Sequence, residues 1–294
     1  MAKPRPSTKK PPEIVVESDK KRVDQWLVEL GIAPTREKAQ ALIMAGQVLA
    51  GTRRIDKAGQ SLNPVEAHTL TLKEGSALKY VSRGGFKLEH ALDVFEIDPT
   101  GKLALDVGAS TGGFTDCFLQ RGARKVIALD VGNSQLAWSL RQDPRVYILD
   151  HTNVRYSENL PEIEPGRGAA LAEVAAVDVS FISLKLVLPA VRNLIIPDAP
   201  LLVLVKPQFE AGRDRVGKGG IIKDASVHRA VLEDLIEWWN TNRFTLLGLI
   251  RSPILGTEGN LEFLAHLQAV EEAVDNNITP AALSLEQLLG RMEL

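Results

Sequence analysis

Four charged residues stand where a charge is costly, at the ends of apolar stretches or inside one. Asp178 and Lys206 each end a short apolar run, Glu262 lies within another, and Lys87 follows the stretch 82–86. A single lysine at a strand end usually only meets solvent. Two lysines and two acids that converge at one sheet edge are harder to explain in that way, and they could orient a reacting group and move its proton.

A glycine-rich stretch, Asp106–Thr115, follows a predicted strand and opens a predicted helix. Gly108, Gly112 and Gly113 would let the backbone turn sharply and approach a ligand closely. The spacing differs from the dinucleotide fingerprint, and a pyrophosphate would avoid the carboxylate of Asp106. S-adenosylmethionine carries a sulfonium and an ammonium group, so an acid at this point favours that cofactor.

Two further acids follow later strand-like runs. Asp130 comes about 24 residues after Asp106, a spacing at which a carboxylate can accept the ribose hydroxyls of a nucleoside, although it could simply cap a turn. Asp150 is a candidate for contact with the adenine edge. Phe114 and Trp138 could line the pocket, with packing in the core as the alternative. The residues expected to bind the cofactor are Asp106, Gly108, Ser110, Gly112, Gly113, Phe114, Asp130 and Asp150.

The alternation of strand-like and helix-like segments in the second part of the chain predicts a mostly parallel α/β sheet with a Rossmann-like fold. The expected strands are 102–106, 125–130, 175–178 and 201–206, followed by an antiparallel pair at 244–255 and 261–267; the expected helices are 112–121 and 226–240, with a peripheral helical segment at 269–294. The strand at 201–206 is almost continuously apolar, as a buried parallel strand must be.

The first part of the chain differs from the rest in charge. Residues 1–80 contain 14 basic and 9 acidic residues, whereas the remainder contains 21 basic and 28 acidic residues. A basic module beside an acidic body is typical of a protein that meets a polyanion through one part only. Charge alone does not decide this, because a basic face is often no more than a solvated surface.

The basic part also predicts a small α+β unit. Apolar residues recur at helical spacing over 23–30, and Thr35 stands where the N-cap of a second helix belongs. Gly46 ends that helix, and short strands are expected at 48–51 and 69–72.

This α+β unit resembles the S4 RNA-binding fold of ribosomal protein S4 and pseudouridine synthases. The resemblance rests on Arg22-Val23-Asp24, Thr35-Arg36 and Ile43-x-x-Gly46-x-Val48. In that family two helices present basic residues to structured RNA, and the alternative is a merely solvated helix face. The implied RNA contacts are Lys20, Lys21, Arg22, Arg36, Lys38, Arg53 and Arg54, with Arg83 in the second part of the chain as a further candidate.

The second part resembles the FtsJ-like ribose 2′-O-methyltransferases, and residues 20–268 together resemble the TlyA family of rRNA methyltransferases, some of which are called hemolysins. The motifs are S-R-G-G-F-K-L at 82–88, the glycine-rich stretch at 106–115, D-V-S-F-I-S-L at 178–184, V-K-P-Q-F-E at 205–210 and G-N-L-E at 259–262. The resemblance implies methylation of a cytidine in the rRNA of the small subunit, the large subunit or both. Residues beyond both ends of the match favour the subtype with two substrates.

The resemblance implies a catalytic tetrad at Lys87, Asp178, Lys206 and Glu262. A ribose 2′-hydroxyl must be oriented and relieved of its proton to attack the sulfonium methyl group, so alignment supplies much of the acceleration. Burial and a second cation nearby favour the neutral form of a lysine. Lys206 is therefore expected as the general base, held by Asp178. Glu262 is expected to position Lys87 or the ribose, and the sequence leaves the division of labour between the two lysines open.

These observations divide the chain into five segments. They are a flexible basic tail at 1–18, an S4-like domain at 19–77, a linker at 78–82, an FtsJ-like methyltransferase domain at 83–270 and a C-terminal helical extension at 271–294. Within the fourth segment, residues 212–223 carry four glycines and four basic residues. They form either a mobile surface loop or a loop over the active site that contacts RNA phosphates.

Composition argues against several other classes. The single cysteine, Cys117, rules out a disulfide framework within the chain and is expected to be a buried helix residue, and together with the five histidines it suggests no metal site. No apolar run approaches the roughly 20 residues of a membrane span, and the N-terminus lacks a secretory signal, so a cytoplasmic protein is expected.

Three rival functions remain to be weighed. A membrane-active hemolysin would need an exposed amphipathic or spanning segment, which the sequence does not show. An RNA-binding protein without methyltransferase activity would not need the four tetrad residues. A small-molecule methyltransferase would not need the S4-like unit.

Overall fold

The computed structural model describes residues 20–30, 32–33, 35–73, 79–132, 135–166, 168–217, 219–256 and 259–270. The predicted basic tail and C-terminal helical extension lie outside these residues. The chain divides into two compact units, Met1–Leu78 and Lys79–Leu294.

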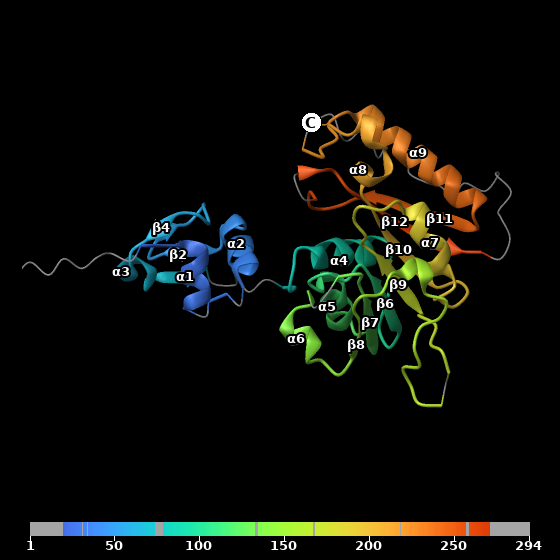
Figure 1. The fold of residues 1–294 in the computed structure, drawn as a ribbon, viewed down its shortest axis with the longest axis horizontal. Coiled ribbons are helices and arrows are strands. Elements are labelled where there is room, and N and C mark those ends of the chain that lie inside the picture. Colours follow the sequence, from blue (N-terminus) through green and yellow to red (C-terminus); the bar gives the residue numbers. More distant parts are fainter. Residues whose placement is uncertain are drawn as a thin grey trace, which may run out of the picture. The chain divides into compact units, whose positions relative to one another are not determined.

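The first unit packs two helices against short strands (Figure 1). Its elements are β1 (Lys21–Arg22), α1 (Val23–Glu29), α2 (Arg36–Met44), β2 (Val48–Ala50), β3 (Arg53–Arg54), β4 (Ser61–Leu62), α3 (Pro64–Ala67) and β5 (Leu70–Leu72). The strands form a three-stranded sheet in the order β3-β2-β5 and a two-stranded sheet of β1 and β4. The predicted N-cap is confirmed, because the Thr35 hydroxyl accepts a hydrogen bond of 3.2 Å from the backbone N–H of Lys38.

The second unit is built on one seven-stranded sheet in the order β11-β12-β10-β9-β6-β7-β8. Its strands are β6 (Leu103–Val107), β7 (Lys125–Leu129), β8 (Val146–Leu149), β9 (Val174–Val177), β10 (Pro200–Val205), β11 (Phe244–Arg251) and β12 (Phe263–Ala269). Strands β6 to β10 are parallel, whereas β12 pairs antiparallel with β10 and with β11. The predicted Rossmann-like sheet with a closing antiparallel pair is confirmed.

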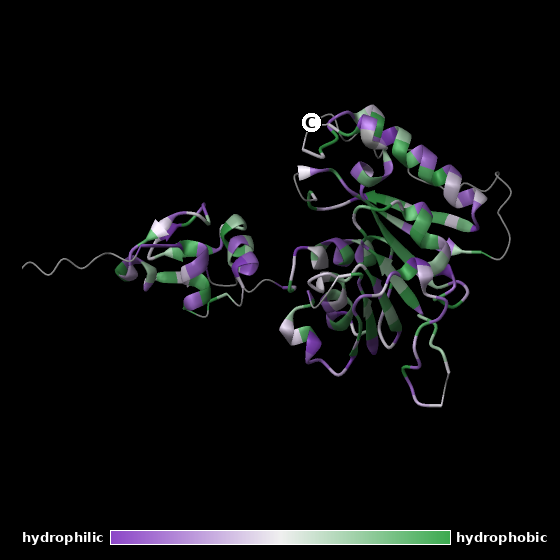
Figure 2. Ribbon diagram, viewed as in Figure 1, coloured by the Kyte–Doolittle hydropathy of each residue, from purple (hydrophilic) through white to green (hydrophobic). Residues whose placement is uncertain are grey.

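Helices cover both faces of this sheet (Figure 1). They are α4 (Gly84–Val94), α5 (Gly113–Gln120), α6 (Trp138–Arg141), α7 (Leu184–Arg192), α8 (Pro207–Glu210) and α9 (Ala225–Thr241). Helices α4 and α5 pack on one face, where Cys117 is fully buried as expected, and α7 and α9 pack on the other. Figure 2 shows hydrophobic central strands, with hydrophilic residues on the helices that cover them. Burial of one strip of each helix on the apolar sheet supplies the main driving force for this arrangement.

Two expectations from the sequence are wrong in detail. Trp138 was expected to pack in the core or line the pocket, but it is 75% exposed at the start of the four-residue helix α6. Glu262 was expected inside a strand, but it directly precedes β12. The strand β12 therefore keeps an apolar run, while the carboxylate of Glu262 lies at its end.

Candidate active site

The glycine-rich stretch forms the turn between β6 and α5. Gly108 and Gly112 have φ angles of 86° and 94°, which a residue with a side chain rarely adopts. A Cβ atom at Gly108 would collide with the backbone carbonyl of Asp178, and one at Gly113 would collide with the hydroxyl of Ser82. The three chain segments can approach one another this closely only because these positions lack side chains.

A cavity of about 310 Å³ opens at the carboxyl end of the central strands. All four tetrad residues line it, from α4, from the segments after β9 and β10, and from the residue before β12. The predicted cofactor residues Asp106, Gly108, Ser110, Gly113 and Phe114 and the predicted RNA contact Arg83 line it as well. Gly112 is not among the lining residues, but it is the N-cap residue of α5, and a Cβ atom there would collide with Leu140.

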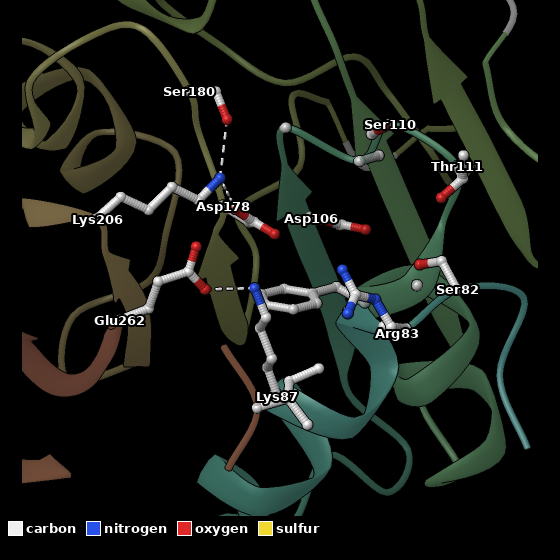
Figure 3. A pocket seen from close by; sticks show the side chains of 16 residues that line it. Ser82, Arg83, Lys87, Asp106, Ser110, Thr111, Asp178, Ser180, Lys206 and Glu262 are labelled. Atoms are coloured by element: carbon white, nitrogen blue, oxygen red, sulfur yellow. Dashed lines mark hydrogen bonds and ion pairs between the residues drawn. The ribbon is translucent and has the colours of Figure 1, made fainter. Parts of the chain in front are cut away.

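The tetrad consists of two lysine–acid pairs that face the same cavity (Figure 3). The Nζ atom of Lys206 lies 2.6 Å from Oδ1 of Asp178 and donates a hydrogen bond of 2.8 Å to the hydroxyl of Ser180. Lys87 donates to the carboxylate of Glu262. Glu262 is only 2% exposed and Lys87 only 8%, so Glu262 can act on a substrate in the cavity chiefly through Lys87.

Gly256 makes room for the second of these pairs. A Cβ atom at Gly256 would collide with the carboxylate of Glu262. The backbone carbonyl of Glu262 also accepts a hydrogen bond of 2.9 Å from the N–H of Ser252. The end of β11 and the turn that follows it therefore fix the position of Glu262 before β12.

Asp106 is fully buried beneath the cavity. Its Oδ2 accepts hydrogen bonds from the backbone N–H (2.8 Å) and the hydroxyl (2.6 Å) of Thr115, while its Oδ1 has no hydrogen-bond partner among the described residues. Burial raises the pKa of Asp106 to about 7, and the nearby charges of Asp178 and Asp130 add to this, against the opposing effect of Thr115. A buried carboxylate of this kind favours a cation next to its free oxygen.

A second cavity, of about 450 Å³, shares Gly108, Ser110, Asp178 and Ser180 with the first, so the two are adjacent. Asp130 lines the second cavity and accepts hydrogen bonds from the backbone N–H groups of Ser110 (2.8 Å) and Gly132 (2.7 Å).

Asp150 lies further out, in a small hollow that it shares with Asp130, and it pairs with Arg141 at 3.2 Å. Both of these acids thus border the cavities in which the cofactor is predicted, but each already has a donor within the protein.

Seven of the predicted RNA-contacting residues lie in the first unit and not at this site. Arg22 and Arg36 both pair with Asp24, Lys21 pairs with Glu29 at 3.0 Å, and Arg54 pairs with Asp56 at 2.7 Å. Lys20, Arg22, Arg36, Arg53 and Arg54 are exposed, and Lys21 and Lys38 are partly exposed.

Phe181 is a residue whose place the sequence did not reveal. It is 89% exposed, has a φ of 62° and packs its ring against Phe209 with the centroids 4.8 Å apart. It follows Asp178 by three residues and lines the second cavity. A phenylalanine in the sequence did not indicate an exposed site residue, because large apolar residues are normally buried.

Two negative findings apply to the part of the chain that the structure describes. No helix there is both long and apolar enough to cross a membrane. No three side chains of His, Cys, Asp or Glu gather there as ligands of a metal ion would.

The chain is similar to known proteins over most of its length. The FtsJ-like methyltransferase family matches residues 80–269, and the S4 domain family matches residues 21–65. A Bacillus subtilis protein that carries the name rRNA methyltransferase YqxC is 47% identical over 263 residues, which are 90% of this chain and 91% of that protein.

Two further relatives extend this picture. The Mycobacterium tuberculosis protein named 16S/23S rRNA (cytidine-2′-O)-methyltransferase TlyA is 41% identical over 247 residues, which are 84% of this chain and 89% of that protein. A solved structure of a Streptococcus thermophilus protein with the name hemolysin has a TM-score of 0.70 and 42% identity, and the match covers 92% of this chain and 95% of that one.

Proposed function

The chain belongs to the FtsJ-like methyltransferase family, and on that premise we propose that it transfers a methyl group from S-adenosylmethionine to the 2′-hydroxyl of a cytidine ribose in rRNA. The observation that carries the proposal is the cavity at the sheet edge. Two lysine–acid pairs face it, and a buried carboxylate with a free oxygen lies beneath it.

The residues around Asp106 fit S-adenosylmethionine, which when bound supplies an electrophilic methyl group on a sulfonium. The free Oδ1 of Asp106 lacks the positive partner that the ammonium group of such a ligand offers. Gly108 exposes backbone between the two adjacent cavities, so a long ligand can lie across both. Asp130, whose oxygens retain acceptor capacity beyond their two backbone donors, would bind the ribose of the nucleoside part.

The tetrad would orient the RNA hydroxyl and take its proton. In its neutral form, Lys206 would accept the proton that the 2′-hydroxyl gives up on methylation, while Asp178 and Ser180 hold its Nζ in place. Lys87, which is held by its hydrogen bond to Glu262, donates a hydrogen bond to the ribose and aligns it. Both acids are therefore positioning residues for the two lysines that touch the substrate.

The RNA would be held outside the tetrad by aromatic and basic groups. The exposed ring of Phe181 offers a face on which an unstacked base can stack. Arg83 lines the first cavity, where it would pair with a backbone phosphate of the bound RNA. The S4 family match and the names of the TlyA relatives support ribosomal RNA as the substrate. A ribosomal substrate implies activity in the cytoplasm.

The test is methyl transfer from labelled S-adenosylmethionine to purified small and large ribosomal subunits. We expect label in rRNA and, for Lys206→Ala at saturating RNA and cofactor, a turnover lower by about 10²- to 10⁴-fold. Lys185→Ala is the matched control, because Lys185 also pairs with an aspartate, Asp234 at 2.7 Å, but on the surface of α7. Its turnover should stay within about twofold of wild type.

Failure would have a distinct signature. If the wild-type protein binds S-adenosylmethionine but labels neither subunit, the chain is an RNA-binding protein without this activity. If Lys206→Ala keeps wild-type turnover, the tetrad assignment is wrong even though the activity stands.

A further inference from the structure

A fully buried acid joins the two helices of the S4 unit. Asp24, in the first turn of α1, is 0% exposed. Its Oδ1 accepts a hydrogen bond from Nε of Arg22 (3.0 Å), and its Oδ2 accepts one from Nη2 of Arg22 (2.9 Å). From α2, Nη2 of Arg36 (3.2 Å) and Nε2 of Gln40 (2.9 Å) reach the same Oδ2. One carboxylate therefore receives four hydrogen bonds from three side chains.

The two arginines, unlike the acid, reach solvent. The side chain of Arg22 is 44% exposed and that of Arg36 is 49% exposed. Arg22 is held through two of its nitrogens in the bidentate geometry that fixes the plane of a guanidinium. The cluster thus has a buried negative centre, two outward cations and a net charge of +1.

The charges of the cluster stay fixed over the physiological pH range. The hydrogen bonds from Arg22, together with those from Gln40 and Arg36, hold the pKa of Asp24 well below its usual range in spite of burial. The carboxylate therefore remains ionised, and the guanidinium groups remain its partners, wherever the protein is folded.

We propose that Asp24 is a positioning residue for RNA binding, which holds Arg22 and Arg36 as a preformed pair for a phosphate of the RNA backbone. This inference rests on the proposed rRNA substrate. A free arginine loses rotamer freedom when it grips a phosphate, and that loss weakens binding. Here the two side chains are ordered when the unit folds, and each keeps N–H groups that do not face Asp24.

The sign of the effect separates this role from simple electrostatics. A negative charge beside a phosphate site repels the phosphate, so removal of the charge alone would tighten RNA binding. If Asp24 positions the arginines, its removal weakens binding instead. Asp24→Asn is suited to this test, because the Nδ2 group of asparagine turns one acceptor into a donor that faces N–H groups in either orientation of the amide: that of Arg22 Nε at the Oδ1 position, or those of Arg22, Arg36 and Gln40 at the Oδ2 position.

The experiment measures the Kd of the full-length chain for bacterial 16S and 23S rRNA by filter binding. The proteins are wild type, Asp24→Asn, Arg36→Gln and the double variant. We expect Asp24→Asn to raise the Kd about tenfold and to raise it by a smaller factor when Arg36 is already glutamine, because Asp24 then positions Arg22 alone. Tryptophan fluorescence, to which Trp26 in the core of the same unit contributes, checks that each variant is folded at the assay temperature.

Asp56→Asn is the matched control in the same unit. Asp56 also pairs with an arginine, Arg54 at 2.7 Å, but the Asp56 side chain is 66% exposed and pairs with no second arginine among the residues that the structure describes. Its Kd should stay within about twofold of wild type or fall.

Three results would overturn the inference. The inference is wrong if Asp24→Asn leaves the Kd unchanged or lowers it. It is also wrong if Asp24→Asn raises the Kd by the same factor in the Arg36→Gln background as in wild type. Both leave the proposed methyltransferase activity intact, because turnover at saturating RNA is measured separately. A wild-type chain that binds neither rRNA removes this inference together with the proposed substrate.

Discussion

Asp24 and Asp106 are both fully buried aspartates, yet their surroundings shift their pKa values in opposite directions. Hydrogen bonds from Arg22, Gln40 and Arg36 lower the pKa of Asp24, whereas burial raises the pKa of Asp106 to about 7. The difference lies in the partners, because Asp106 receives only the neutral donors of Thr115 and has two other acids nearby. A buried carboxylate that pairs with cationic side chains of its own chain has its charge compensated. A buried carboxylate without such partners is suited to bind a cationic ligand.

The two neighbouring lysines pair with acids other than Asp106. Lys206 pairs with Asp178, and Lys87 pairs with Glu262. Each cation of the tetrad is thus committed to another acid. In the proposed function, this arrangement would leave the free oxygen of Asp106 for the cationic part of the cofactor and the two lysines for the RNA.

The largest expected effect is on folding stability, with opposite signs for the two acids. A shift of the Asp106 pKa from 3.8 to about 7 means that the folded protein binds more protons there than the unfolded chain does, so stability falls as pH rises from about 4 to above 7. Asp106→Asn should therefore raise the free energy of unfolding at pH 8 by about 2–4 kcal/mol, and by much less at pH 5. Urea titration without cofactor at both pH values measures this.

Asp24→Asn provides the contrast in the same titration. Because the folded-state pKa of Asp24 is lowered, its stabilising effect is present at all pH values above its unfolded pKa. We expect a loss of about 1–3 kcal/mol at pH 5 and at pH 8 alike. If Asp106→Asn were destabilising at pH 8 by a similar amount, the two acids would be alike and the comparison would fail.

The second effect concerns cofactor affinity. Loss of a charge-assisted contact costs about 1.5–3 kcal/mol, so Asp106→Asn should weaken S-adenosylmethionine binding by about 10- to 150-fold. Asp24→Asn, equally buried but in the other unit, should bind it as wild type does. Isothermal titration calorimetry at pH 7.5 compares the three proteins, and equal affinities for all three would show that Asp106 does not contact the cofactor.

The smallest effect is the pH dependence of the same affinity. Only the ionised form of Asp106 attracts a cation, so with a pKa of about 7 the wild-type affinity should fall about eightfold between pH 7.5 and pH 6. Asp106→Asn should lack this component. A parallel pH profile for wild type and variant would assign the titration to the ligand or to another group.

Much of the second unit could be predicted because its strands are short, apolar and followed by polar residues. The strand β10 was expected at 201–206 and spans Pro200–Val205, and the antiparallel pair of β11 and β12 was expected as well. The helix α4 was not predicted, since it begins with two glycines, which are poor helix formers. Tertiary packing explains the glycine at position 85, because a Cβ atom there would collide with the ring of Tyr80.

The location of the tetrad could be predicted in part. The carboxyl ends of parallel strands meet at one edge, which brings Asp178 and Lys206 together. Glu262 joins them because β12 is antiparallel to β10, so that Phe263 pairs with Val205 and the residue before it lies near the end of β10. The sequence could not show which lysine pairs with which acid, nor that Phe181 is exposed, because both depend on loop geometry.

The identity of the methylated atom tests the central claim most directly. Ribosomal subunits are incubated with the wild-type protein and S-adenosylmethionine, and their rRNA is digested to nucleosides for mass spectrometry. The proposed function predicts new 2′-O-methylcytidine, which is missing when Lys206→Ala replaces the wild type. A methyl group on a base, with every ribose unchanged, would contradict it.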